Sequence, residues 1–114
     1  MLFFKRKAAL VCGISMEPVL KSGDLVFYEP ISNKSCLSKG DIIIFNHPIR
    51  KINLIKRISE IKVSGIEVSG DNINFSDDSN YFGLINKETI IGVVTSHISR
   101  KSIQNFKKIF KLKK

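Results

Sequence analysis

The sequence has few cysteines and histidines and no long apolar run, and each shortage excludes a class of protein. Two cysteines, Cys12 and Cys36, are too few for a disulfide scaffold, so we expect a reduced, intracellular chain. The chain also has only two histidines, which are far apart in the sequence. We therefore expect no metal site and no cofactor. No window approaches the roughly 20 apolar residues that a membrane-spanning helix needs. Low-complexity tracts and domain-scale repeats are also missing from the chain.

The positive charge is unevenly distributed. A formal net charge of +9 invites a nucleic-acid partner. Residues 8–99, however, hold nine basic and ten acidic side chains, so the body of the chain is nearly neutral. The excess lies in residues 5–7 and from residue 100 onward. This distribution predicts no specific nucleic-acid partner.

A chain of 114 residues predicts one domain, which we place at residues 1–100, followed by a basic tail at residues 101–114. In this tail Ile103, Phe106, Ile109 and Phe110 recur at helical spacing among lysines. Two readings are open: an amphipathic helix on an anionic membrane surface, or a solvated, partly disordered tail. We expect a cytoplasmic protein, with membrane association as the alternative.

Before the tail the sequence shows strand patterns and no helical period. A continuous apolar run at residues 42–45 predicts a strand buried on both faces. Ser64 and Gly65 predict a two-residue hairpin turn. The expected strands are residues 9–12, 25–28, 42–45, 52–63, 66–68 and 90–95. The fold should be mainly β, a small, strongly bent sheet or open barrel with long loops.

The predicted strand at residues 52–63 carries a lysine among aliphatic residues. Leu54, Lys56 and Ile58 share one face because side chains alternate along a strand. A lysine with its usual pKa of about 10.4 cannot act as a base at neutral pH, but burial lowers that pKa. Arg57 should point the other way, towards solvent or an acid in the loop at residues 70–80.

A serine in the loop at residues 13–24 is the residue that such a base would activate. Ser15 lies between Gly13, which permits a tight turn, and Pro18, which stiffens the segment. A serine hydroxyl needs a base to become a nucleophile, and Lys56 is the candidate. The backbone N–H of Ser15 is the candidate donor to the oxyanion. Ser76, in the 70–80 loop, would orient the lysine.

Each of these residues also has an ordinary interpretation. A loop serine usually has no catalytic role, and a lysine on an apolar face often reaches solvent at the sheet edge. His47 and His97 are expected to be structural or exposed. A Ser–His–Asp arrangement with Asp77 or Asp78 has no local signature. Cys12 is expected to be a small core residue.

Four segments in order resemble the boxes of the type I signal peptidases, a family of Ser–Lys proteases. They are residues 13–24, 39–45, 56–58 and 70–79. The resemblance implies that Ser15 is the nucleophile, Lys56 the general base and Ser76 the residue that orients Lys56. It departs from the family at Gly13, where some members carry a hydroxyl that donates to the oxyanion. A second departure is Asn80, where an arginine is common.

The resemblance also implies supporting roles in substrate binding or in holding the loops. The residues concerned are Gly13, Met16, Pro18, Arg57, Asp71 and Asp78. Asp71 and Arg57 would support the 70–80 loop, and Asp78 is a further partner for Arg57. The implied partner is a precursor protein whose N-terminal leader is removed.

A narrower resemblance is to the small maturation proteases of nickel-type superoxide dismutase. It rests on the His47-Pro48 segment shortly before Lys56, the chain length and the lack of an N-terminal anchor. Three alternatives are a general signal peptidase at the membrane, a self-cleaving regulator and a non-enzymatic basic binding module. Only 14 residues precede Ser15, which disfavours the self-cleaving regulator.

Overall fold

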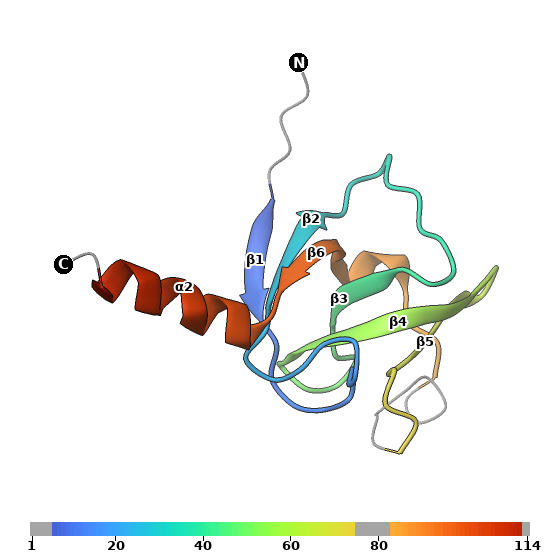
Figure 1. The fold of residues 1–114 in the computed structure, drawn as a ribbon. Helices are drawn as coiled ribbons and strands as arrows, with labels where there is room; N and C mark the ends of the chain where they lie inside the picture. Colours follow the sequence, from blue (N-terminus) through green and yellow to red (C-terminus); the bar gives the residue numbers. More distant parts are fainter. Residues whose placement is uncertain (1–5, 75–82, 113–114) are drawn as a thin grey trace.

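The computed structural model describes residues 6–74 and 83–112, with side chains up to residue 108. Six antiparallel strands form one sheet in the order β1-β2-β6-β3-β4-β5, and a single α-helix follows the last strand (Figure 1). The strands are β1 (Lys7–Leu10), β2 (Leu25–Pro30), β3 (Ile42–Asn46), β4 (Asn53–Lys62), β5 (Gly65–Ser69) and β6 (Ile90–Ile98). A short 3₁₀ turn, η1 (Lys87–Thr89), precedes β6, and α2 covers Arg100–Leu112. The mainly β fold predicted from the sequence is confirmed.

The sheet is bent so that each face encloses its own apolar core. One core contains Ile43, Phe45 and Ile58, with Val68 of β5. The other contains Val26, Ile44 and three residues from the loop after β1: Val11, Met16 and Leu20. The run at residues 42–45 therefore lies buried on both faces as predicted, because alternate residues of β3 enter different cores.

Irregular pairing increases the bend. The register shifts between Phe27 and Tyr28 on β2 and between Ile44 and Phe45 on β3, both against β6. A bulge of this kind raises the local twist of a sheet. Gly92 of β6 lies close against β2, since a Cβ there would meet the Tyr28 ring and, at 2.6 Å, the Glu29 carbonyl oxygen.

Several predicted boundaries are wrong: β2 runs on to Pro30 and β6 to Ile98, and the first strand and the β4–β5 turn also differ. The first strand is Lys7–Leu10 rather than residues 9–12, because the chain turns away at Gly13, whose φ is +90°. The β4–β5 turn consists of Val63 and Ser64, since Lys62 already pairs with Gly65. Gly65 belongs to β5, where a Cβ would approach Leu84 Cβ to 2.8 Å.

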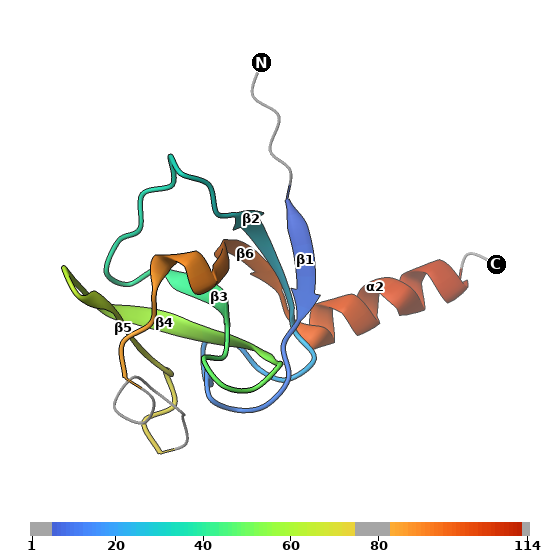
Figure 2. The same cartoon turned by 180° about the vertical axis from the view of Figure 1, so that it is seen from behind.

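The predicted basic tail is a helix over the described residues. Ser99 begins α2, because its hydroxyl accepts the N–H of Ser102 at 3.1 Å, as a helix N-cap does. The helix projects away from the sheet, as the two opposite views show (Figures 1 and 2). Within residues 6–74 and 83–112, no helix has the length and apolarity to cross a membrane. The prediction of a partly disordered tail is wrong for Arg100–Leu112.

Candidate active site

Ser15 lies on a loop that is closed at its base by backbone hydrogen bonds. We call residues 13–24 the serine loop. Val11 N–H donates to the Asp24 carbonyl oxygen at 2.8 Å, and Gly23 N–H donates to the Val11 carbonyl oxygen at 2.8 Å. The loop starts at Gly13, whose φ of +90° favours glycine. The serine is thus presented by a short, closed loop rather than by a long, free segment.

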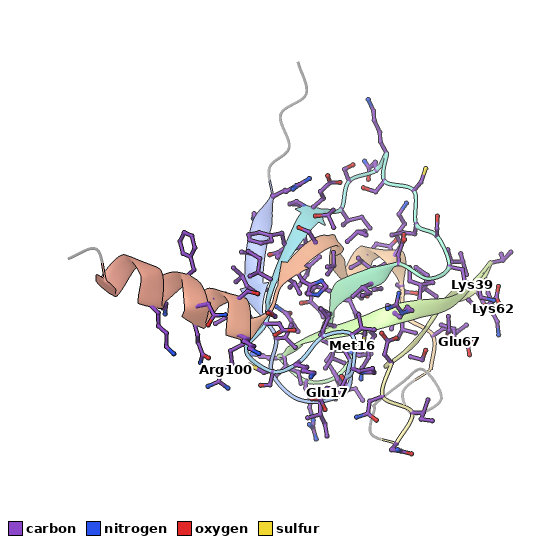
Figure 3. All side chains as sticks on the ribbon, in the orientation of Figure 1. Met16, Glu17, Lys39, Lys62, Glu67 and Arg100 are labelled. Atoms are coloured by element: carbon purple, nitrogen blue, oxygen red, sulfur yellow. The ribbon has the colours of Figure 1, made fainter. Side chains whose placement is uncertain are left out.

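Two apolar side chains anchor the serine loop in the core. Met16 and Leu20 are each 1% exposed, and Leu20 N–H donates to the Met16 carbonyl oxygen at 2.9 Å. Figure 3 labels Met16 and its neighbour Glu17 on this loop. Pro18 is exposed, and Ser15 is half-buried. Burial of Met16 next to the serine limits where the serine backbone can move.

Lys56 is buried in the middle of β4. It is 2% exposed, pairs with Ile43 of β3 and precedes the buried Ile58 on the same face. Burying a lysine amine costs several kcal/mol unless it is neutral or hydrogen-bonded. The alternation of the sequence predicts this apolar face. In the structure the whole Lys56 side chain is buried, whereas a lysine at a sheet edge would keep its amine in solvent. The snorkelling interpretation does not describe Lys56.

Arg57, the next residue, points the other way and binds Asp71. Its Nε donates to Asp71 Oδ1 and its Nη2 to Oδ2, both at 2.8 Å. Its Nη1 donates to the Gly40 carbonyl oxygen at 2.7 Å. The hydrogen bonds with Asp71 raise the pKa of Arg57, against the opposing effect of partial burial. A two-pronged arginine–carboxylate pair of this kind holds both partners in one orientation.

Asn72 connects the same loop to the serine. Its backbone N–H donates to the Ser15 carbonyl oxygen at 2.9 Å, and its side-chain Nδ2 donates to the Ile14 carbonyl oxygen at 3.0 Å. The adjacent residues Asp71 and Asn72 therefore hold Arg57 on one side and the serine loop on the other. The sequence analysis did not single out Asn72, although it stands in the Gly-Asp-Asn segment that carried the resemblance.

The described contacts thus link the strand of Lys56 and the loop of Ser15 through Asp71 and Asn72. The Ser15–Lys56 dyad and the oxyanion role of the Ser15 N–H stay predictions. Ser76 and Asp78 lie outside the described residues. His97 is exposed, and His47 is half-buried in a turn.

A groove of about 320 Å³ opens beside Ser15. Ala9, Leu10 and Val11 line one wall, and Asn53, Leu54 and Ile55 of β4 line the other. β1 is an edge strand, and β4 pairs with β5 only from Arg57 onward, so among the described residues both walls present unpaired strand edges. Cys12 also lines the groove and is exposed, so the prediction that it is a core residue is wrong.

The comparisons with known proteins agree with this arrangement. A family profile described as "Signal peptidase, peptidase S26" matches residues 1–65, which contain both Ser15 and Lys56. The chain belongs to the peptidase S26 family of signal peptidases. A curated relative, mitochondrial inner membrane protease subunit 1 of Mus musculus, is 30% identical over 95 residues, covering 64% of this chain. The chain spans 57% of the length of that relative.

The matched segment ends at residue 65, so the Asp71–Asn72 link described above is a property of this structure rather than of the match.

Proposed function

We propose that this member of the family is a serine endopeptidase in which Ser15 is the nucleophile and Lys56 the general base. The observation that carries the proposal is the complete burial of Lys56 on an apolar face, one residue from the arginine that anchors Asp71. A buried lysine is costly to stability, so its presence in a small core needs another reason. Activation of a serine supplies that reason.

In this mechanism the neutral amine of Lys56 accepts the proton of the Ser15 hydroxyl as the oxygen attacks the scissile carbonyl carbon. The tetrahedral oxyanion is stabilised by a hydrogen bond from the Ser15 backbone N–H. Lys56 then returns the proton to the departing amine, which leaves an ester on Ser15. Water, deprotonated by Lys56, hydrolyses the ester and regenerates the serine. Ser76 is proposed to orient the lysine amine through its hydroxyl.

The groove supports an extended peptide as the substrate. Unpaired edges of β1 and β4 offer backbone donors and acceptors to a strand that enters between them, and the groove walls are mainly apolar. Asn72 and Met16 hold the serine loop at the side of this groove. A peptide bound in this way would present a backbone carbonyl to Ser15 without a deep specificity pocket.

For the substrate we propose the precursor of a nickel-type superoxide dismutase, whose N-terminal leader would be removed. The support is the His47-Pro48 segment and the short interval between Ser15 and Lys56. In the structure this segment forms the tight β3–β4 turn, in which His47 Nδ1 accepts the N–H groups of Ile49 and Arg50, each at 3.0 Å. The short turn brings β4 back directly to Lys56.

The test is the intact mass of a nickel-type dismutase precursor co-expressed with wild type, with Ser15→Ala or with Ser22→Ala. Ser22 is a second serine of the same loop and controls for loss of a hydroxyl. We expect the leader to be lost with wild type and with Ser22→Ala but kept with Ser15→Ala. A precursor that stays uncut with all three overturns the dismutase assignment, and cleavage by Ser15→Ala overturns the nucleophile.

A general signal peptidase acting at a membrane is the second candidate, and α2 favours it. Within its described side chains the helix has no acid, its lysines are exposed, and Phe106 is 60% exposed. Cationic and apolar side chains on one helix suit the surface of an anionic bilayer. We propose this peripheral contact through residues 101–114 as an addition to the protease activity.

Sedimentation with vesicles tests the contact. Wild-type protein should bind vesicles containing phosphatidylserine and should not bind vesicles of phosphatidylcholine alone. Phe106→Ser should weaken the binding severalfold. Val63→Ser, which changes a fully exposed apolar residue in the β4–β5 turn, should not. Equal binding by wild type and Phe106→Ser contradicts the proposed contact.

A further inference from the structure

The turn between β3 and β4 lies at the end of the groove and carries two cations. Arg50 and Lys51 are exposed in this turn, and residues 46–53 contain no acid. A hollow of about 430 Å³ lies against the turn. Asn53 lines both this hollow and the groove beside Ser15, so the two adjoin at this residue. The groove therefore leads from the serine to a positively charged rim.

The backbone of this turn is held by its own hydrogen bonds. His47 Nδ1 accepts the N–H groups of Ile49 and Arg50, and His47 N–H donates to the Ile52 carbonyl oxygen at 2.9 Å. In Figures 1 and 2 the turn lies at the same end of the molecule as the serine loop. Charges carried by an ordered backbone cost less entropy to use in binding than charges on a free segment.

The spacing along β4 indicates which substrate residues would meet the turn. A peptide paired with an unpaired strand edge advances about 3.3 Å per residue, in step with that strand. If its scissile bond lies beside Lys56, the residue beside Asn53 is about three positions away. Side chains about four to six positions from the scissile bond would then face Arg50 and Lys51.

The chemistry indicates that these are leader residues. The acyl part of the substrate stays attached to Ser15 until water releases it, whereas the amine part departs after the first step. A groove built beside the serine serves the part that stays, which is the leader. We propose that the β3–β4 turn recognises acidic side chains about four to six residues before the scissile bond, an inference that rests on the proposed protease function.

Cleavage and binding of matched leaders test this inference. Three versions of one precursor would carry paired glutamates, alanines or lysines at those positions. For wild type we expect kcat/KM to rank glutamate above alanine above lysine, with about three- to tenfold between the extremes at low salt and less at high salt. Arg50→Glu/Lys51→Glu should reverse the ranking, mainly through KM.

A control variant with the same change in net charge distinguishes an effect of the turn from an effect of the overall charge of the protein. Lys34→Glu/Lys87→Glu changes two exposed lysines, one in the β2–β3 loop and one in η1, and should preserve the wild-type ranking. An unchanged kcat/KM across the three leaders, or reversal by the control as well, overturns the inference.

Binding separates this inference from the proposed function. The probe is a fluorescein-labelled peptide of about 10 residues, long enough to span groove and turn, in the same three versions. Its affinity for Ser15→Ala is measured by anisotropy. If binding ranks with peptide charge and Arg50→Glu/Lys51→Glu reverses that ranking, the proposed role of the turn is supported. This holds even if wild type cleaves no precursor, a result that would overturn the proposed protease function instead. If wild type cleaves the precursor but binding does not rank with peptide charge, the proposed role of the turn is overturned and the proposed protease function is retained.

Discussion

The backbone N–H of Asn72 donates a 2.9 Å hydrogen bond to the carbonyl oxygen of Ser15, 57 residues earlier in the chain. The Asn72 side chain repeats the link one residue away, to the Ile14 carbonyl oxygen at 3.0 Å. The preceding residue, Asp71, binds the arginine that follows Lys56. The position of the serine relative to β4 thus depends on one short segment after β5.

Asn72→Ala should therefore lower kcat more than it changes KM. The variant keeps the backbone bond to Ser15. It loses the side-chain bond to Ile14 and the oxygen that accepts the Asn74 N–H at 3.2 Å, so the serine loop is less restrained. We expect kcat to fall about tenfold, because small misplacements of a nucleophile are costly. Steady-state cleavage kinetics check this. Asn74→Ala, two residues on and exposed, is the control, and an equal loss of kcat in both variants would show a general effect of the loop.

Arg57 and Asp71 should show strong energetic coupling in a double-mutant cycle. Arg57→Lys, Asp71→Asn and the double variant would be unfolded in urea. We expect a coupling energy of about 1.5–3 kcal/mol, since the pair is two-pronged and partly buried. Lysine cannot reproduce the fork of donors that reaches both carboxylate oxygens and Gly40.

The control for that cycle is the Lys62–Glu67 pair, which joins β4 to β5. Its atoms are 3.3 Å apart, and near the β4–β5 turn it is more exposed than Arg57–Asp71; Figure 3 labels both side chains. Coupling there should not exceed about 1 kcal/mol. Equal coupling energies in the two pairs would mean that the two-pronged geometry of Arg57–Asp71 adds nothing to the coupling energy.

Lys56→Met separates a catalytic lysine from a structural one. Methionine has a similar shape and needs no hydrogen bond, so the free energy of unfolding should stay within about 1 kcal/mol of wild type or rise. Cleavage of the precursor should be abolished. Thermal unfolding and cleavage are measured on the same preparation, with Lys62→Met at the exposed end of β4 as control. Activity retained by Lys56→Met would rule out Lys56 as the base.

Acid should destabilise the junction between the serine loop and α2. Burial alone would raise the pKa of Asp24, but hydrogen bonds from the backbone N–H groups of Lys21 and Arg100, with nearby His97, hold that pKa below its usual value. Figure 3 labels Arg100 at the start of α2. A carboxylate whose pKa is depressed by folding stabilises above its unfolded pKa of about 3.9. That stability is lost as pH falls through the folded value.

The variant Asp24→Asn tests this linkage. At neutral pH it should cost about 1–2 kcal/mol, because a buried charge-assisted acceptor of two N–H groups is replaced. Below about pH 4 the difference between variant and wild type should shrink, since protonation removes the same charge from wild type. Urea titrations at pH 7, 5 and 3.5 check it. A difference that is constant across this range would show that the carboxylate charge is not the cause.

Sequence periodicity predicted most of the strands, because a strand buried on one or both faces leaves its pattern in the chain. The run at residues 42–45 and the alternation around Lys56 gave β3, β4 and the direction of Arg57. Boundaries were less accurate where they depend on a glycine. The sequence pattern predicts that Gly65 is a turn residue. In the structure a glycine is required at this position of β5 because Leu84, distant in the sequence, packs against it.

What the sequence by itself determined is the set of chemical groups and their local setting. It identified a serine in a glycine-initiated loop, a lysine on an apolar strand face and an arginine facing an acid. Only the tertiary structure decided how these groups are connected. The exposure of Cys12, the hydrogen bonds of Asn72 and the groove between β1 and β4 come from segments far apart in the chain. Such contacts depend on how the sheet bends, which no local pattern encodes.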